Sequence, residues 1–216
     1  MQIHYFGLSS FKITTKEAVV ITDPFDKESG LLPPRGAADI IILSEKLNKL
    51  YSSTSGFAGE PFLINDPGDY DLKGVTVTGI PLKQGVDETK DGKPRYVTAV
   101  LIEAEDMRIL NLTHIREFTM KSDDLESLGE IDILILPVGG NSVMTAKDAS
   151  KIAHEIEPKI VIPSHYATDG LALPYEKVDG FIKEMGGKSE NMEKLLIKKK
   201  DLPMDQMKII TLDALR

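Results

Sequence analysis

Two runs of consecutive apolar residues in the second half of the chain constrain the fold more than any other feature. Ile133-Leu134-Ile135-Leu136 and Ile160-Val161-Ile162 carry no polar residue at alternate positions. A strand with one face in water alternates between apolar and polar residues, so these runs predict strands that are covered on both faces. A helical pattern over residues 146–157 separates them, and Thr145 with Asp148 three residues later is typical of a helix start. This order indicates a layered α/β protein.

Short apolar segments bounded by turn residues predict the other elements. We expect strands at residues 3–6, 11–14, 18–22, 39–43, 62–64, 75–80, 98–104, 108–112, 195–198 and 208–212, and further helices near 122–128 and 175–185. The stretch 84–95 is rich in Gly, Asp and Lys, which predicts a hairpin or a mobile loop. There is no internal repeat and no low-complexity linker, so we predict a single domain over residues 1–216.

Composition excludes several classes of function. A net charge of −8 works against binding to nucleic acid, and the Lys198-Lys199-Lys200 run is predicted to be a solvated face. The absence of Cys excludes disulfides and thiolate zinc sites, which fits a cytoplasmic location. No apolar run approaches the length of about 20 residues that a membrane span needs, and the amino terminus lacks a signal-peptide pattern. We therefore expect a cytoplasmic protein that begins at Met1 and binds no membrane.

Five segments, in order, resemble one family. They are Gly7-Leu8-Ser9-Ser10-Phe11, Ile21-Thr22-Asp23-Pro24-Phe25, Asp66-Pro67-Gly68-Asp69-Tyr70, Asp132-Ile133-Leu134-Ile135-Leu136-Pro137 with Gly139-Gly140-Asn141, and Val161-Ile162-Pro163-Ser164-His165-Tyr166. Together they resemble the metallo-β-lactamase superfamily, in particular its small bacterial zinc-dependent hydrolases related to the L-ascorbate-6-phosphate lactonases. The resemblance implies a four-layer α/β/β/α sandwich with a metal cleft.

The metal motif of that family is replaced here. In the family, Ser or Thr at the end of a strand precedes His-x-His-x-Asp-His, and this chain has Glu45, Leu47, Lys49 and Leu50 at those positions, after Ser44. The resemblance maps three more ligands outside the motif. A third His becomes Gln84, the bridging Asp becomes Glu117, and only the last His is kept, as His165.

Other cleft positions also follow from the resemblance. Leu8 replaces a further cleft His, and His114 matches a His that is usually structural. Asp23 is expected to organise the cleft loops by accepting backbone hydrogen bonds. His165 is either a relic held by packing or a functional group of a remodelled pocket. Gly139-Gly140-Asn141 is either an anion-binding turn or a simple chain reversal.

A zinc hydrolase needs several donor atoms around one cation, which lowers the pKa of bound water to about 7. Leu and Lys remove such donors, so we expect no zinc and no other cofactor. We hypothesise that Lys49 supplies the missing positive charge to Glu117 or Glu45, because clustered carboxylates would otherwise repel one another. The alternative is that Lys49 lies in solvent.

Three functional classes follow. The first is a non-catalytic binding or interaction module that takes a small ligand or a protein segment. The second is a metal-dependent hydrolase of the lactone or phosphoester type that uses Glu45, Gln84, Glu117 and His165, an oxygen-rich set that suits Mn or Mg better than zinc. The third is a structural protein or homo-oligomer.

Overall fold

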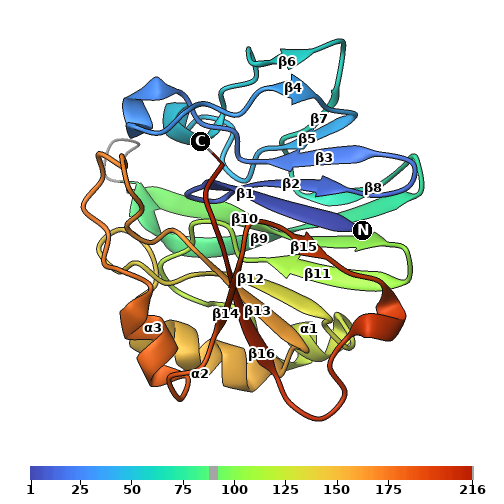
Figure 1. The fold of residues 1–216 in the computed structure, drawn as a ribbon. Coiled ribbons are helices and arrows are strands. Elements are labelled where there is room, and N and C mark those ends of the chain that lie inside the picture. The colour runs from blue at the N-terminus through green and yellow to red at the C-terminus, as the bar shows by residue number, and fades with distance from the viewer. Residues whose placement is uncertain (88–91, 216) are drawn as a thin grey trace.

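The computed structural model describes residues 1–87 and 92–215, in which two β-sheets pack face to face (Figure 1). One sheet has six strands in the order β15 (Leu195–Leu196), β1 (Gln2–Gly7), β2 (Ser10–Thr14), β3 (Val19–Thr22), β5 (Ile40–Ile42) and β7 (Phe62–Ile64). The other has eight, in the order β14 (Glu190–Met192), β16 (Lys208–Leu212), β13 (Ile160–Ser164), β12 (Ile133–Pro137), β11 (Met107–Asn111), β10 (Lys93–Ala104), β9 (Val75–Asp87) and β8 (Gly68–Leu72). The main apolar core fills the space between them.

The two apolar runs form neighbouring parallel strands, β12 and β13, in the middle of the larger sheet. Every residue of both strands is buried, which confirms that they are covered on both faces. Strands β11, β12, β13 and β16 run parallel, as do β3, β5 and β7 in the smaller sheet. The carboxyl ends of these parallel strands carry most of the predicted site.

The α-helices lie against the outer face of the eight-stranded sheet (Figure 1). They are α1 (Ser122–Ser127), α2 (Ala146–Ile156) and α3 (Asp179–Glu184). Helix α2 begins as predicted, because the Thr145 hydroxyl accepts the Asp148 N–H at 3.2 Å. Helix α3 is shorter than the predicted helix at 175–185, because the main chain of Glu176 bonds to Gly139 and Ala167 instead.

The outer face of the six-stranded sheet is covered differently from the α-helical layer that the resemblance implied. Within the described residues, this layer consists of the 3₁₀ turns η1 (Lys27–Ser29) and η2 (Lys49–Tyr51) and the strand pair β4 (Gly36–Ala37) and β6 (Phe57–Ala58) (Figure 1). Asn48 caps one turn only, and the Ser52-Ser53-Thr54-Ser55-Gly56 stretch that follows is poor in helix formers. A second apolar cluster packs beneath these turns.

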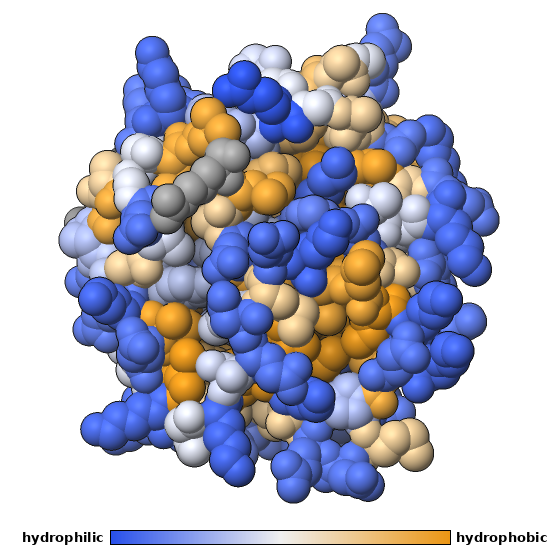
Figure 2. Space-filling model, viewed as in Figure 1, coloured by the Kyte–Doolittle hydropathy of each residue, from blue (hydrophilic) through white to orange (hydrophobic). Residues whose placement is uncertain are grey.

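The predicted hairpin at 84–95 is present in its described part, where Lys93 of β10 pairs with Asp87 of β9, while residues 88–91 lie outside the described residues. Strands β4, β6, β8 and β14 have no counterpart among the predicted strands. Hydrophilic side chains dominate the face shown in Figure 2, with apolar patches between them. None of the helices within residues 1–87 and 92–215 is long and apolar enough to cross a membrane. A last 3₁₀ turn, η3 (Lys199–Asp201), precedes β16.

Candidate functional site

Four polar residues at strand ends form the centre of the site. Asp23 follows β3, Ser44 follows β5, His114 follows β11 and His165 follows β13, and all four are at least 95% buried. Asp23 and His165 adopt the left-handed backbone region, with φ of 38° and 51°. Such a backbone is uncommon for residues other than glycine and is often retained at functional sites.

Asp23, Ser44 and His114 are joined by hydrogen bonds. The Asp23 carboxylate accepts the backbone N–H and the hydroxyl of Ser44, each at 2.8 Å, as predicted for a residue that organises the cleft loops. His114 Nδ1 lies 3.2 Å from the Ser44 hydroxyl oxygen and 3.8 Å from Asp23 Oδ2. Because the Ser44 hydrogen points to Asp23, His114 must donate from Nδ1 to the Ser44 oxygen.

The Glu45 carboxylate accepts hydrogen bonds from three residues. Arg95 Nε and Nη2 donate to its two oxygens at 2.8 and 2.7 Å, and Asn48 Nδ2 donates at 2.9 Å. His114 Nε2 lies 3.1 Å from Glu45 Oε2, which can only accept. Burial would raise the pKa of Glu45, but the donors, Arg95 foremost, hold it well below its ordinary value.

These contacts require both ring nitrogens of His114 to donate, so its imidazole is the protonated form. Burial would lower the pKa of His114, but the carboxylates of Asp23 and Glu45 outweigh it, and the pKa is raised. Asp23 and Glu45 then contribute two negative charges, and His114 and Arg95 two positive charges. Among the described residues, these four charges cancel within the cluster.

Tyr51, the last residue of η2, packs against both histidines. Its ring stacks on His114 with centroids 4.2 Å apart and lies edge-on to His165 at 5.5 Å. Its hydroxyl shares a hydrogen bond with His165 Nε2 at 3.1 Å. Burial, followed by the charge of His114, lowers the pKa of His165 well below its ordinary value, so its imidazole is neutral.

The side chain of Gln84 binds the backbone of the loop that carries Glu117. Gln84 Oε1 accepts the N–H groups of Arg116 and Glu117 at 2.7 and 3.0 Å, and its Nε2 donates to the Glu117 carbonyl at 2.8 Å. The Glu117 side chain itself is exposed. Gln84 therefore holds the loop that carries Glu117, and its amide atoms are already used in doing so.

The remaining motif positions do not converge on the centre. Leu47 is 71% exposed, so it does not fill the cleft. Leu8 is buried in the apolar cluster beneath η2, and Leu50 packs on the same cluster. Lys49 is exposed and makes no ion pair with any described residue, so the hypothesis that it neutralises Glu45 or Glu117 is wrong. As the first residue of a 3₁₀ turn it faces solvent, and Arg95 provides the charge to Glu45 instead.

The side chains at the expected ligand positions do not form a metal-binding group. In residues 1–87 and 92–215, no three His, Cys, Asp or Glu side chains form a group that could hold a metal ion. In the alternative ligand set, Glu45 is bound by Arg95, and Gln84 is bound by backbone groups. His165 is bound by Tyr51. Glu117 is exposed and takes part in none of the ion pairs among the described residues. The residues present do not fit the metal that the fold resemblance implied.

Sequence reasoning missed the residues that complete this centre. Arg95 lies at the end of the stretch predicted as a hairpin or loop, and Tyr51 lies one residue beyond the last motif position. The only sequence signal for Tyr51 is that it is the aromatic residue next to the replaced motif. A basic residue in a predicted hairpin gives no signal for Arg95.

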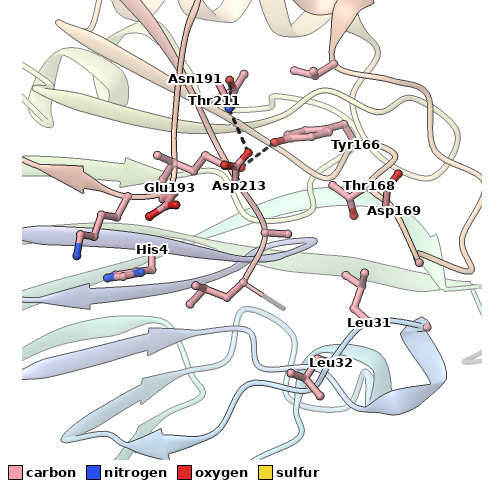
Figure 3. A pocket seen from close by; sticks show the side chains of 17 residues that line it. His4, Leu31, Leu32, Tyr166, Thr168, Asp169, Asn191, Glu193, Thr211 and Asp213 are labelled. Atoms are coloured by element: carbon pink, nitrogen blue, oxygen red, sulfur yellow. Dashed lines mark hydrogen bonds between the residues drawn. The ribbon is translucent and has the colours of Figure 1, made fainter.

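A cavity of about 1000 Å³ lies away from this centre, and none of the predicted site positions lines it (Figure 3). Its labelled walls include His4, Leu31, Leu32, Tyr166, Thr168, Asp169, Glu193 and Asp213. Asp213 accepts a hydrogen bond from Asn191 at 3.1 Å. The wall therefore combines apolar side chains with carboxylates.

The other polar residues singled out from the sequence have structural partners. His4 pairs with Gln2, and His154 Nδ1 bonds to the Ser150 carbonyl oxygen. The Gly140 N–H donates to the Met144 carbonyl, which fits a chain reversal rather than an anion site. The lysine run is exposed as predicted, but Lys199 also pairs with the buried Asp132 at 2.8 Å.

Comparisons with known proteins agree with this fold. The family model described as the beta-lactamase superfamily domain matches residues 2–165. A UPF0173 metal-dependent hydrolase of Lysinibacillus sphaericus is 28% identical over 202 residues, covering 78% of this chain and 86% of the relative. A proposed Zn-dependent hydrolase of the metallo-β-lactamase superfamily from Thermotoga maritima has a TM-score of 0.77 at 25% identity, over 98% of both chains. An isothiocyanate hydrolase from Delia radicum gut bacteria has a TM-score of 0.69 at 12% identity, over 97% and 96%, which is a likeness of fold alone.

Proposed function

This chain belongs to the β-lactamase superfamily, and we propose that it is a member whose cleft no longer forms a metal centre and that acts as a binding or interaction protein. One observation carries the proposal. The side chains at the expected ligand positions are engaged with protein groups or turned to solvent, and in the part of the chain that the structure describes the charges of Asp23, Glu45, His114 and Arg95 cancel. Without a bound cation there is no activated hydroxide, and general acid–base groups alone supply only about 10²–10⁴-fold in rate.

A small ligand of such a protein would not enter the former cleft, because Tyr51 and Leu8 fill it. The cavity in Figure 3 is of the size that small ligands occupy, and it has the mixed apolar and polar lining that such sites share. It is the candidate ligand site under this proposal. A protein segment as partner is the alternative.

The second candidate is a metal-dependent hydrolase, which is favoured by the similarity to the metal-dependent hydrolase of Lysinibacillus sphaericus. It would use Glu45, Gln84, Glu117 and His165 with Mn or Mg. To do so, Glu45 would have to leave Arg95, and His165 would have to leave Tyr51. Both rearrangements break buried or partly buried hydrogen bonds, so the structure as it stands favours the binding protein over the hydrolase.

Elemental analysis of protein purified without chelator, followed by turnover assays, separates the two. Under our proposal the protein carries no stoichiometric transition metal, and hydrolysis of lactones, phosphodiesters and β-lactams equals the buffer rate with or without added Mn. About one metal per chain, together with a Mn-dependent rate that Glu117→Ala abolishes, would establish the hydrolase instead.

A single domain over residues 1–216 and a cytoplasmic location are part of the same proposal and stay predictions.

A further inference from the structure

The mismatch between this centre and a metal site has a specific structural basis. In a metal centre, the cation both neutralises the carboxylates and ties the strand ends together. Here the ends of β3, β5, β11 and β13 are tied by contacts among Asp23, Ser44, His114, His165 and Tyr51. Two residues that do not lie at those strand ends, Tyr51 and Arg95, complete the arrangement.

We propose, building on the proposed function, that Arg95 and Tyr51 together replace the metal ions. Arg95 supplies the positive charge that neutralises Glu45, and Tyr51 occupies the space beside His114 and His165 that a cation would need. The two residues are therefore positioning residues of a metal-free centre.

The geometry at Arg95 supports the charge replacement. Two of its nitrogens bind the two Glu45 oxygens at 2.7 and 2.8 Å, a bidentate arrangement that is stronger and more directional than a single contact. The Glu45 side chain is 19% exposed, so it depends on this pairing more than a surface carboxylate would. Strand β10 is anchored at the same point, because the Thr98 N–H donates to the Ser44 carbonyl.

The geometry at Tyr51 supports the steric replacement. Its side chain is 4% exposed and makes a stacked contact with His114, an edge contact with His165 and a hydrogen bond to His165 Nε2. A cation could bind His165 Nε2 only after the Tyr51 ring had moved.

The charge replacement is tested by thermal unfolding of Arg95→Met. Arg116→Met is the matched control, because Arg116 is exposed and makes no ion pair with a described residue. We expect Arg95→Met to lower the melting temperature by about 2–8 °C more than the control does. Glu45→Gln added to Arg95→Met should restore part of that loss, because it removes the uncompensated charge. Equal melting temperatures for Arg95→Met and Arg116→Met would overturn the charge replacement.

The steric replacement is tested by Co²⁺ titration of the wild-type protein, followed by visible absorption, and by thermal unfolding of Tyr51→Ala, which removes the ring, with Tyr96→Ala as control. We expect no saturable Co²⁺ band, no change of melting temperature with EDTA, and a loss of thermal stability for Tyr51→Ala alone. One equivalent of Co²⁺ whose band disappears in His165→Asn would overturn the inference. So would identical melting temperatures for Tyr51→Ala and Tyr96→Ala.

These outcomes separate the two proposals. Hydrolysis with a metal bound elsewhere would refute the proposed function and leave the roles of Arg95 and Tyr51 intact. A protein that is inactive and metal-free, but in which both variants match their controls, would refute only the replacement of the metal by Arg95 and Tyr51.

Discussion

Truncating Tyr51 is the most informative perturbation of the centre. Complete removal of a buried aromatic side chain costs about 3–5 kcal/mol, from lost burial and the cavity left behind. Tyr51→Ala also leaves His165 Nε2 without its hydrogen bond, which adds about 1–3 kcal/mol if no water replaces it. The residue sits on a 3₁₀ turn near the surface, where relaxation offsets part of this sum. We therefore expect a loss of about 4 kcal/mol.

The assay is urea unfolding followed by far-UV circular dichroism, with thermal unfolding as a second measure. A loss of about 4 kcal/mol corresponds to a decrease of about 8–16 °C in melting temperature for a chain of this size. Tyr96→Ala is the control, because Tyr96 is 51% exposed and its truncation should stay within about 0.5 kcal/mol. A cost below about 1 kcal/mol for Tyr51→Ala would refute the idea that this ring holds the centre together.

Three further predictions concern the same region. The pKa of His114 is raised in the folded protein, so its contribution to stability is complete below about pH 6.5 and is lost as the pH rises through the folded-state pKa. The pKa of His165 is lowered in the folded protein, so its contribution to stability is lost as the pH falls below about 6.5. In urea unfolding from pH 5 to 9, His114→Asn should flatten the alkaline decline and His165→Asn the acid decline, and unchanged profiles would contradict these assignments. In the wild-type protein, Gln84 Oε1 accepts hydrogen bonds from the backbone N–H groups of Arg116 and Glu117. Gln84→Ala should therefore remove the hydrogen-exchange protection of these two amides, with little change in global stability. Gly139→Ala should destabilise by at least about 2 kcal/mol, because its Cβ would lie 1.9 Å from the His165 carbonyl oxygen, while Gly180→Ala, which meets only ordinary contacts, should be neutral or stabilising.

The sequence predicts best where burial decides the structure. Strands β12 and β13 could be placed because uninterrupted apolar runs have few alternatives to a strand covered on both faces. Strand β8 could not, because Gly68-Asp69-Tyr70-Asp71-Leu72 is an exposed edge strand with two acidic residues, and such a composition also suits a loop. Helix α3 was predicted too long because the residues before it are held by main-chain pairing, which leaves no signature in the sequence.

Of the candidate positions, the structure brings Asp23, Glu45 and His165 into one cluster, whereas their partners were not predicted. Asp23 and His165 lie at strand ends, so the topology alone brings them to one edge. The partner of Glu45 could not be predicted, because choosing between Lys49 and Arg95 depends on where two side chains point. Position 49 starts a 3₁₀ turn and faces solvent, whereas position 95 lies on a strand that passes beside Ser44.

Under the proposed function, the balance of charge also explains why metal binding at this centre would require coordinated changes. Restoring Asp at position 49 alone would place a carboxylate in solvent and leave the centre unchanged, since Lys49 takes no part in it. Restoring a His at position 45 would remove the Glu45 carboxylate that Arg95 and His114 both contact and would place two histidines beside a guanidinium, which is electrostatically unfavourable. Even a full ligand set would meet the Tyr51 ring against His165. Under our proposal, both of these single changes are therefore neutral or destabilising until Arg95 and Tyr51 change as well, and this is what keeps the centre free of metal.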